Sequence, residues 1–388
     1  MLSNKITFSD FDISEGKISF VYKEEGEKHT KNSIVFELAP SIIPRKDLIA
    51  ISLSTLCAKK YDAIHFDLKM SNRALSAISN FTDATVTSLD TFDILIDQKK
   101  GGNVTLNFSG GFDSLAAKCL MPDNTKLVSM DYGGRFSREK TFFEKFDTCI
   151  VSTNLLETPL RYNSWSMMGI ASILFSDYLG TTYQTFGSIL EAGPNNFSDN
   201  PVAAKNISFP PFAAAGMENA PYVLGLTEIG TLRVLSHFSP ELISGSLDSL
   251  ASPGEEKRYR KQVLTLIESE KSKKDFKLNL VDKPSKPHFK FGQSFAVDFL
   301  SLYVIKNTGL DTASHTLSDI PDEAVQLANK LTLDFYERVN PKFLVNFPKP
   351  LLPNYLSKLG QVGILPYTDN DWKEFNEVRS FLSKNYTI

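Results

Sequence analysis

One short segment of the chain carries residues that could bind the phosphates of a nucleotide. It reads Ser109-Gly110-Gly111-Phe112-Asp113-Ser114 and lies between an apolar run, VTLNF, and a run with helical spacing, SLAAKCL. Two glycines allow a tight backbone turn that comes close to a ligand. The helix that follows presents N–H groups and the positive end of its dipole. Strand, glycine turn and helix N-terminus together favour the binding of phosphate or pyrophosphate.

The polar residues of this segment refine the prediction. The hydroxyls of Ser109 and Ser114 add hydrogen-bond donors, while the carboxylate of Asp113 suits either a helix cap or a Mg²⁺ ion that bridges phosphates. The patterns GxxxxGK[ST] and GxGxxG are both absent from the segment. The alternative is a turn whose glycines serve only backbone geometry. The position of the segment directly after a strand favours phosphate binding.

Strands and helices alternate around this segment. Strands are expected at 104–108, 126–130, 148–151 and 182–186, and helices at 113–120, 137–146 and 164–179, the last of them buried. Connections of this length are too long for hairpins, so the alternation predicts an α/β fold with a doubly wound, mainly parallel sheet. Ligands of such sheets bind at the carboxyl ends of the strands.

The chain divides into three predicted regions. The charged, glycine-ended break at 98–102 separates a small N-terminal α+β domain, residues 1–100, from the alternating domain, residues 101–275. The first region opens with a hairpin of 5–10 and 17–22. Residues 244–254 are rich in small side chains and are expected to form a loop, and a basic helix follows. Residues 276–388 are expected to form a mostly helical C-terminal region.

Composition narrows the class of protein. Of 388 residues, 42 are Lys or Arg and 45 are Asp or Glu, and the resulting net charge of −3 argues against bulk electrostatic binding of nucleic acid. The longest uncharged stretch, 162–176, is shorter than the roughly 20 residues that cross a bilayer. The three cysteines form no CxxC pair, and the opening residues lack a basic start followed by an apolar block. A cytoplasmic protein without a membrane partner is therefore expected.

Two motifs carry a specific resemblance. SGGFDS resembles the SGGxDS signature of the PP-loop ATP pyrophosphatases, which have an adenine nucleotide α-hydrolase-like fold and cleave ATP between its α- and β-phosphates. The stretch Asp131-Tyr132-Gly133-Gly134-Arg135, followed by Glu139, is similar to DYGQRH…E of the 7-cyano-7-deazaguanine synthases, the QueC family. Arg161 and Asn163 resemble that family's RN element, and LTEI at 226–229 resembles its LTKAEI without the lysine. The resemblance covers about residues 103–261.

The chain also departs from that family. Gly134 and Phe136 replace the family's Gln and His, which leaves the identity of the substrate open. The family's four zinc-binding cysteines are absent from the corresponding region, residues 244–260, so no zinc is expected and local packing must replace it.

The resemblance implies a role for each matching residue. The residues implied to bind ATP are Ser109, Gly110, Gly111, Phe112, Asp113, Ser114, Met130, Asp131 and Gly187. Those implied to bind the second substrate are Tyr132, Arg135, Asn163, Ser188 and Glu191. Asp113, Ser114 and Arg161 are the catalytic candidates, with Asp113 positioning Mg²⁺. Lys257 and Arg258 are candidates to neutralise phosphate, the alternative being a solvated basic helix face.

The activity implied is that of an AMP- and pyrophosphate-forming ligase. A carboxylate, as in a deazaguanine-type acid, would be adenylated and then attacked by ammonia or an amine. The amine could belong to a partner protein, as in the diverged forms that accompany anti-phage operons. Two alternatives stay open: a PP-loop amidotransferase for a sugar or another small carboxylic acid, and a nucleotide-binding scaffold without turnover. A homodimer is also left open.

Overall fold

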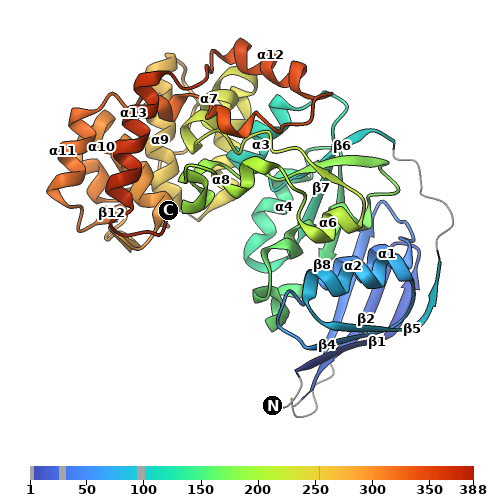
Figure 1. Ribbon diagram of the computed structural model, residues 1–388. Helices are drawn as coiled ribbons and strands as arrows, with labels where there is room; N and C mark the ends of the chain where they lie inside the picture. The colour runs from blue at the N-terminus through green and yellow to red at the C-terminus, as the bar shows by residue number, and fades with distance from the viewer. Residues whose placement is uncertain (1–3, 26–31, 94–100, 253) are drawn as a thin grey trace. The chain divides into compact units, whose positions relative to one another are not determined.

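The computed structural model describes residues 4–25, 32–93, 101–252 and 254–388, without the side chain of Arg135 (Figure 1). The predicted break at 98–100 lies outside these residues. Two compact units divide the chain. Unit 1 comprises Met1–Ser109, Asn124–Thr185 and Ile207–Asn219, and unit 2 comprises Gly110–Asp123, Phe186–Asn206 and Ala220–Ile388.

Unit 1 is built on one large sheet, in which the order is β10-β9-β6-β7-β8-β3-β2-β1-β4-β5. The strands are β1 Lys5–Ser14, β2 Lys17–Glu24, β3 Asn32–Ala39, β4 Ala63–Ser71, β5 Thr85–Phe92, β6 Asn103–Asn107, β7 Lys126–Asp131, β8 Thr148–Thr153, β9 Thr181–Thr185 and β10 Glu218–Asn219. The pairs β1–β2, β2–β3 and β3–β8 are antiparallel, and the other pairings described in this sheet are parallel. The protein is therefore α/β with a mainly parallel sheet, which is compatible with the doubly wound fold expected.

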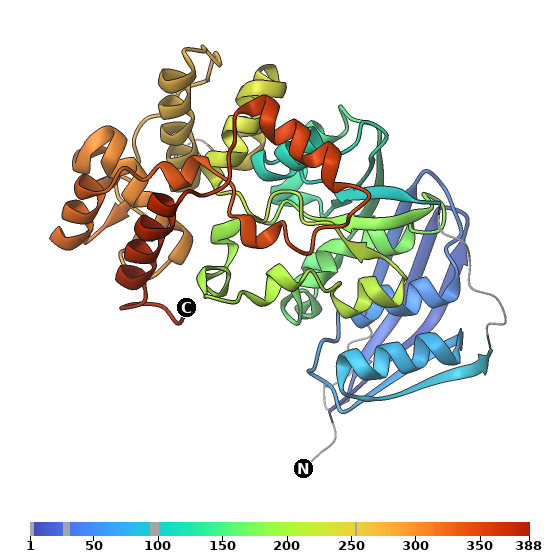
Figure 2. The ribbon, with the colours of Figure 1, turned by 45° about the horizontal axis from the view of Figure 1, so that its top comes forward.

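The first five strands show why apolar and polar residues alternate in their sequence. In β1, Ile6 and Phe8 are fully buried, whereas Thr7 between them and Ser9 after them are partly exposed. This period of two places one row of apolar side chains on one face of the sheet. Helices α1 (Lys46–Ser54) and α2 (Asn72–Thr82) lie on the same face of these strands (Figures 1 and 2). The predicted hairpin of the first two strands is confirmed.

Strand β3 joins the strands of the predicted N-terminal region to the alternating segment. It pairs with β2 on one side and with β8 on the other, and Leu38 lies opposite Val151. Strands from both sides of residue 100 thus belong to one sheet. The predicted division at 100 and 275 stays a prediction about folding units.

The remaining helices of unit 1 are short: α4 Ser137–Phe143, α5 Ile170–Leu174 and α6 Pro210–Ala214. The predicted long, buried helix at 164–179 is wrong. Its first part is a 3-10 helix, η4 (Trp165–Gly169), and α5 ends at Leu174. The Ser172 and Ser176 hydroxyls each donate to the carbonyl three residues earlier, a bond that competes with regular helix. Trp165 is 48% exposed.

Unit 2 is mostly helical, as expected for its C-terminal part. Its helices are α3 Phe112–Leu120, α7 Glu228–Phe238, α8 Ile243–Leu250, α9 Glu256–Ser272, α10 Phe295–Ser314, α11 Asp322–Lys330, α12 Leu352–Val362 and α13 Asp369–Leu382, and β11 Phe289–Lys290 pairs with β12 Leu317–Ser318. The loop predicted at 244–254 is wrong because Ile243 and Leu247, four residues apart, are both buried on one face of α8.

Helix α10 lies at the centre of the C-terminal helices, beside α9, α11 and α13 (Figure 1). Its Phe299 ring stacks on Tyr336, with 4.3 Å between the ring centroids, and contacts Phe197 at 4.9 Å. Aromatic pairs of this kind account for much of the chain's large phenylalanine content.

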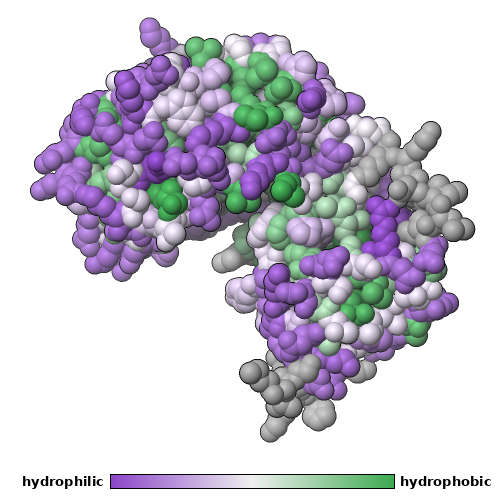
Figure 3. Space-filling model, in the orientation of Figure 1, coloured by the Kyte–Doolittle hydropathy of each residue, from purple (hydrophilic) through white to green (hydrophobic). Residues whose placement is uncertain are grey.

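The molecular surface is mixed in character. On the face drawn in Figure 3, hydrophobic residues form separate patches among hydrophilic ones. Among the described residues, no helix is long and apolar enough to span a bilayer.

Candidate active site

The Ser-Gly-Gly segment is the turn between β6 and α3, as predicted. Strand β6 ends at Asn107 and α3 begins at Phe112. Gly110 has a φ of 79°, which lies in the left-handed region that favours glycine. Gly111 is the N-cap of α3, and its carbonyl oxygen accepts a hydrogen bond of 3.0 Å from the Ser114 hydroxyl. The turn thus has the tight backbone that the sequence requires of it.

The turn follows the strand at which the order of the parallel sheet reverses. If strands β6 to β10 are numbered 1 to 5 along the chain, their order across the sheet is 3-2-1-4-5. Strand β6 therefore has β7 on one side and β9 on the other. The Asn107 side-chain amide ties the ends of β6 and β9 together, since it donates to Gln184 Oε1 at 3.1 Å and to the Thr185 carbonyl at 3.0 Å. A crevice at the carboxyl ends of such strands is where open α/β sheets bind ligands.

Gly187 allows two backbone segments of unit 2 to meet. A Cβ atom on this residue would lie 2.6 Å from the Ser114 backbone nitrogen, which is closer than real Cβ contacts. Gly187 is therefore required because the segment after β9 passes directly against the first turn of α3. Ser188, beside it, is exposed.

Asp113 points into a buried group of charged side chains. Its Oδ1 accepts a hydrogen bond of 2.9 Å from the hydroxyl of Thr231 on α7. Burial raises the pKa of Asp113 above its usual value, although the positive charge of Lys261 opposes the shift. Among the described residues, no group of three or more His, Cys, Asp or Glu is arranged to hold a metal ion.

Lys261 and Glu228 form the ion pair of this group. The Lys261 ammonium donates to Glu228 Oε1 at 2.6 Å and lies 5.2 Å from the centre of the Phe112 ring. Burial alone would raise the pKa of Glu228, but the charges of Lys261 and Arg260 outweigh it and lower that pKa. Both members of the pair are therefore charged.

Glu191 lies in a 3-10 helix, η5 (Leu190–Ala192), and caps the start of α7. Its Oε1 accepts a hydrogen bond of 2.8 Å from the Glu228 backbone nitrogen. Its Oε2 is buried without a hydrogen-bond partner among the described residues. Burial raises the pKa of Glu191 to about 8, against the effect of the Glu228 N–H bond and with the help of the Glu228 charge.

The second motif lies at the end of β7, in unit 1. The Asp131 carboxylate accepts hydrogen bonds from Gly133 N at 2.9 Å, Lys140 Nζ at 2.7 Å and Ser152 Oγ at 2.9 Å. Burial would raise the pKa of Asp131, but these three bonds together lower it. Asp131 is thus an ionised, firmly oriented carboxylate at a strand end.

The neighbours of Asp131 in this motif differ in their burial and in their contacts. Met130 is half-buried, and the buried Tyr132 hydroxyl has no hydrogen-bond partner within the described part of the chain. Burial raises the pKa of Tyr132. Its ring meets that of Phe136, the residue in place of the family's His, edge to face at 6.1 Å. Arg135 lies in a 3-10 turn, Gly134–Phe136, and its side chain is outside the described structure.

The Arg161 and Asn163 pair has local partners in unit 1. The Arg161 guanidinium lies over the Tyr162 ring, 4.5 Å from its centre, and bonds to the Tyr162 hydroxyl. The Asn163 amide donates to the Leu56 carbonyl at 2.8 Å, and so ties this segment to the end of α1.

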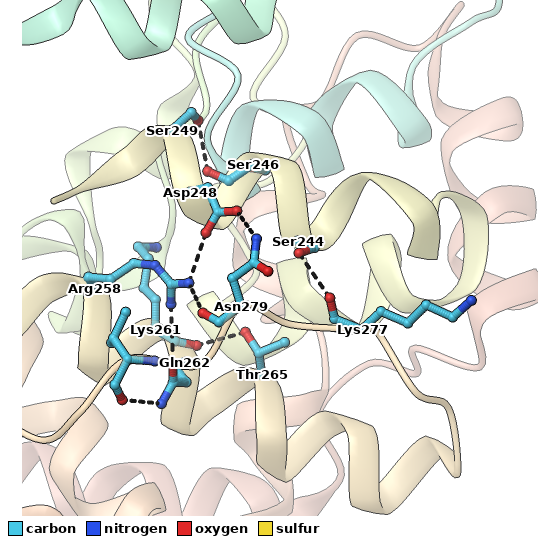
Figure 4. A network of polar contacts seen from close by, with 11 residues as sticks. Ser244, Ser246, Asp248, Ser249, Arg258, Lys261, Gln262, Thr265, Lys277 and Asn279 are labelled. Carbon is cyan, nitrogen blue, oxygen red and sulfur yellow. Dashed lines mark hydrogen bonds and ion pairs between the residues drawn. The ribbon is translucent and has the colours of Figure 1, made fainter. Parts of the chain in front are cut away.

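Arg258 is buried, whereas its neighbour Lys257 is exposed. Only 2% of the Arg258 side chain is exposed, and its Nη2 donates to Asp248 Oδ1 at 2.9 Å and to the Asn279 carbonyl at 2.6 Å (Figure 4). The Gln262 side-chain amide donates to the Val281 carbonyl and accepts a hydrogen bond from the Val281 backbone nitrogen. This network joins α8, α9 and residues 277–281, in the region where the resembled family has its zinc cysteines.

The predicted site residues thus fall into two groups. Unit 1 holds Ser109, Met130, Asp131, Tyr132, Arg135, Arg161 and Asn163, and unit 2 holds Gly110 to Ser114, Gly187, Ser188, Glu191, Lys257 and Arg258. Within unit 2 the structure brings Asp113, Ser114, Gly187 and Glu191 to the start of α3 and α7. Sequence reasoning missed Thr231 and Lys261, and gave Glu228 no role.

A sequence signal for Lys261 exists in retrospect. Lys261, Leu264 and Glu268 recur at spacings of three and four and are all buried on α9. Basic helices usually face solvent, and for this reason the charge of the segment favoured an exposed helix over the buried one that the spacing indicates.

Comparison of the chain with family models, curated proteins and solved structures gave no match. The resemblance described above therefore rests on the motifs themselves.

Proposed function

We propose that the protein is an ATP-dependent ligase of the PP-loop type, which adenylates a small carboxylic acid and transfers the acyl group to ammonia or an amine. The observation that carries this proposal is the Ser-Gly-Gly turn, which follows β6 where the order of the parallel strands reverses. A turn with a left-handed glycine and a helix start at that point favours phosphate binding.

The chemistry asks mainly for positioning and charge stabilisation. A carboxylate oxygen attacks the α-phosphorus of ATP, and the bond to the leaving pyrophosphate breaks. Ammonia then attacks the acyl carbon through its lone pair, and the carbon–oxygen bond to AMP breaks with its electron pair leaving on AMP. The nitrogen loses a proton to solvent. The backbone of residues 109–114 would bind the leaving pyrophosphate.

Mg²⁺ supplies charge neutralisation to most ATP-dependent reactions of this kind. The described geometry gives the Asp113 carboxylate other partners, since it is partly buried, accepts a hydrogen bond from Thr231 and feels the positive charge of Lys261. That environment does not fit a metal site made by the protein alone, so no step is assigned to a Mg²⁺ ion held by Asp113. Phosphate oxygens and water can provide most ligands of Mg²⁺.

For the substrate acid, the proposal names only a chemical class. A deazaguanine-type acid is the first candidate because five residues match the resembled motif, namely Asp131, Tyr132, Gly133, Arg135 and Glu139. The ionised Asp131 at the end of β7 could accept hydrogen bonds from ribose or from a base. The purified protein with ATP, Mg²⁺, ammonium and 7-carboxy-7-deazaguanine should release AMP and pyrophosphate in equal amounts.

The glycine at 187 provides a sharp test of the turn. Gly187→Ala places a Cβ atom against the Ser114 nitrogen, so it should displace the turn and lower kcat/KM for ATP by about 100-fold, or about 2.7 kcal/mol. Gly193→Ala is the matched control because its Cβ would have no neighbour within 4 Å and its φ of −163° is ordinary extended backbone. It should stay within about twofold of wild type.

Three outcomes separate the candidate functions. AMP formation with the deazaguanine acid supports the proposal, and turnover only with sugar acids favours the amidotransferase alternative. ATP binding without AMP formation from any acid would leave the nucleotide-binding scaffold without turnover as the remaining function. Equal losses in Gly187→Ala and Gly193→Ala would argue that the turn is not where ATP binds.

A further inference from the structure

We propose that Phe197 and Asp199 are positioning residues, through which the C-terminal helices hold the segment after β9 against the predicted phosphate-binding turn. This segment, Phe186–Asn206, and the C-terminal helices all belong to unit 2. The inference rests on the proposed function, because the turn is where that function places the leaving pyrophosphate. It gives residues 276–388 a part in the site.

The start of the segment lies directly beside the turn. Gly187 has no room for a Cβ atom, which would lie 2.6 Å from the Ser114 backbone nitrogen. Three residues further on, Leu190 N donates to the Leu226 carbonyl at 2.8 Å, in the stretch that leads into α7. A displacement of the segment at Gly187 therefore changes the space available to the backbone of the turn.

A side-chain hydrogen bond and a buried ring carry this placement along the segment. The Asn196 amide donates to the Leu190 carbonyl at 2.9 Å. Phe197 comes next and is fully buried. Its ring contacts two rings of α10 and one of α13, with centroid distances of 4.8 Å to Phe295, 4.9 Å to Phe299 and 5.0 Å to Phe375. Phe197 thus anchors the segment on the C-terminal helices.

An exposed ion pair holds the segment two residues later. The Asp199 carboxylate pairs with the Arg379 guanidinium on α13, and the Asp199 backbone carbonyl accepts a hydrogen bond of 2.7 Å from Lys342 Nζ. The Lys342 ammonium also lies 5.0 Å from the centre of the Trp372 ring. The Asp199 side chain is 77% exposed, and pairs this exposed add little to global stability. The charge of Asp199 can therefore be changed while the fold is kept.

A further tie closes the end of the segment. The Asn346 amide donates to the Ala204 carbonyl at 2.9 Å, and the Asn206 amide donates to the Asn346 carbonyl at 2.9 Å. The segment is thus attached to the C-terminal region at several points along its second half, and to the turn and to α7 along its first half. Phe197 and Asp199 act on the turn through this segment.

Hydrogen exchange of the full chain tests this positioning without relying on activity. Asp199→Arg puts a like charge beside Arg379 and Lys342, so peptides that cover residues 187–199 should exchange about three- to fivefold faster than in the wild-type protein. The melting temperature should change by less than about 2 °C because the pair is exposed. Adding Arg379→Asp restores an opposite pair and should recover most of the protection.

Glu323→Arg is the matched control, because Glu323 is 65% exposed and pairs with Lys384 in the same unit. It should leave the exchange of residues 187–199 unchanged. In the assay of AMP formation, Asp199→Arg should lower kcat/KM for ATP by about tenfold, since a displaced segment displaces the turn, and adding Arg379→Asp should restore it. The control should stay within about twofold of wild type.

Equal exchange of residues 187–199 in Asp199→Arg and in Glu323→Arg overturns the inference. Faster exchange with an unchanged kcat/KM also overturns it, because the segment would then be held without positioning the turn. Faster exchange in a protein that forms no AMP from any acid overturns the proposed function and leaves the attachment of the segment standing. If Asp199→Arg does not fold, Arg379→Ala, which only removes the charge, decides in its place.

Discussion

At the scale of single residues, two adjacent basic side chains differ in burial and therefore in the role that their surroundings indicate. Lys257 and Arg258 are adjacent and both were candidates to neutralise phosphate, yet Lys257 is exposed while Arg258 is enclosed by Asp248, Gln262 and the Asn279 carbonyl. A guanidinium can satisfy several acceptors at once, which suits a buried position. The geometry indicates a structural role for Arg258.

Arg258→Ala should therefore destabilise the fold. It removes the Arg258 donor from Asp248 Oδ1 and from the Asn279 carbonyl, while Asp248 Oδ2 keeps its bond from the Asn279 amide. We expect a loss of about 2–4 kcal/mol in the free energy of unfolding, less than for a fully buried pair because Asp248 is 41% exposed. Urea unfolding followed by circular dichroism measures it. Lys257→Ala, one residue away, should change stability by about 0.5 kcal/mol or less. Equal effects of the two changes would contradict the assignment.

At the scale of elements, the site depends on how α3 and α7 meet. Thr227, the N-cap of α7, accepts from Gly230 N and donates to the Tyr336 carbonyl, so the start of α7 is fixed from both sides. The start of α3 is tied to α7 through Asp113 and Thr231. The polar bond between these helices lies directly beside the predicted phosphate-binding turn.

Thr231→Val tests that bond. Valine keeps the shape of threonine but removes the hydroxyl that donates to the partly buried Asp113 carboxylate, so we expect a loss of about 1–3 kcal/mol in the free energy of unfolding. Thr231→Ser keeps the hydroxyl and loses one methyl group, which should cost about 1 kcal/mol. Thermal and urea unfolding give both values. A valine variant more stable than the serine variant would mean that the hydroxyl contributes nothing.

At the scale of the whole molecule, the two units are not consecutive in the sequence. The chain leaves unit 1 after Ser109, within the predicted phosphate-binding turn, and returns at Asn124. The C-terminal helices complete unit 2, since Asn340 N donates to the Gly225 carbonyl at 2.8 Å and the Thr227 hydroxyl donates to the Tyr336 carbonyl at 2.6 Å. These bonds hold the segment that leads into α7.

A chain truncated after residue 275 should fail to form unit 2. It lacks α10 to α13, so apolar side chains that are now buried on α7 and α9 would be exposed, and we expect increased dye binding and the loss of unit 2's part of the unfolding enthalpy. Gel filtration and calorimetry beside the full-length chain measure this. A monodisperse truncated chain without added dye binding would instead support residues 276–388 as a separate domain.

The sequence by itself determined most of the local structure. The hairpin of β1 and β2, the strands β6 to β9, the turn at 109–111 and the start of α3 all follow from periodicity and glycine placement, which act over a few residues. It failed at 164–179, where serine hydroxyls bond to the backbone and interrupt the helix, and at 244–254, where the apolar spacing of Ile243 and Leu247 outweighed the small-residue composition.

Only the tertiary structure decided which polar residues lie together. Asp113, Glu191, Glu228 and Lys261 come from four separate segments, and nothing in their spacing relates them. It also decided that β3 pairs with β8 and that Arg258 is enclosed. The physical reason is that burial and pairing of charges depend on contacts between distant segments, whereas a sequence pattern reports only on neighbours along the chain.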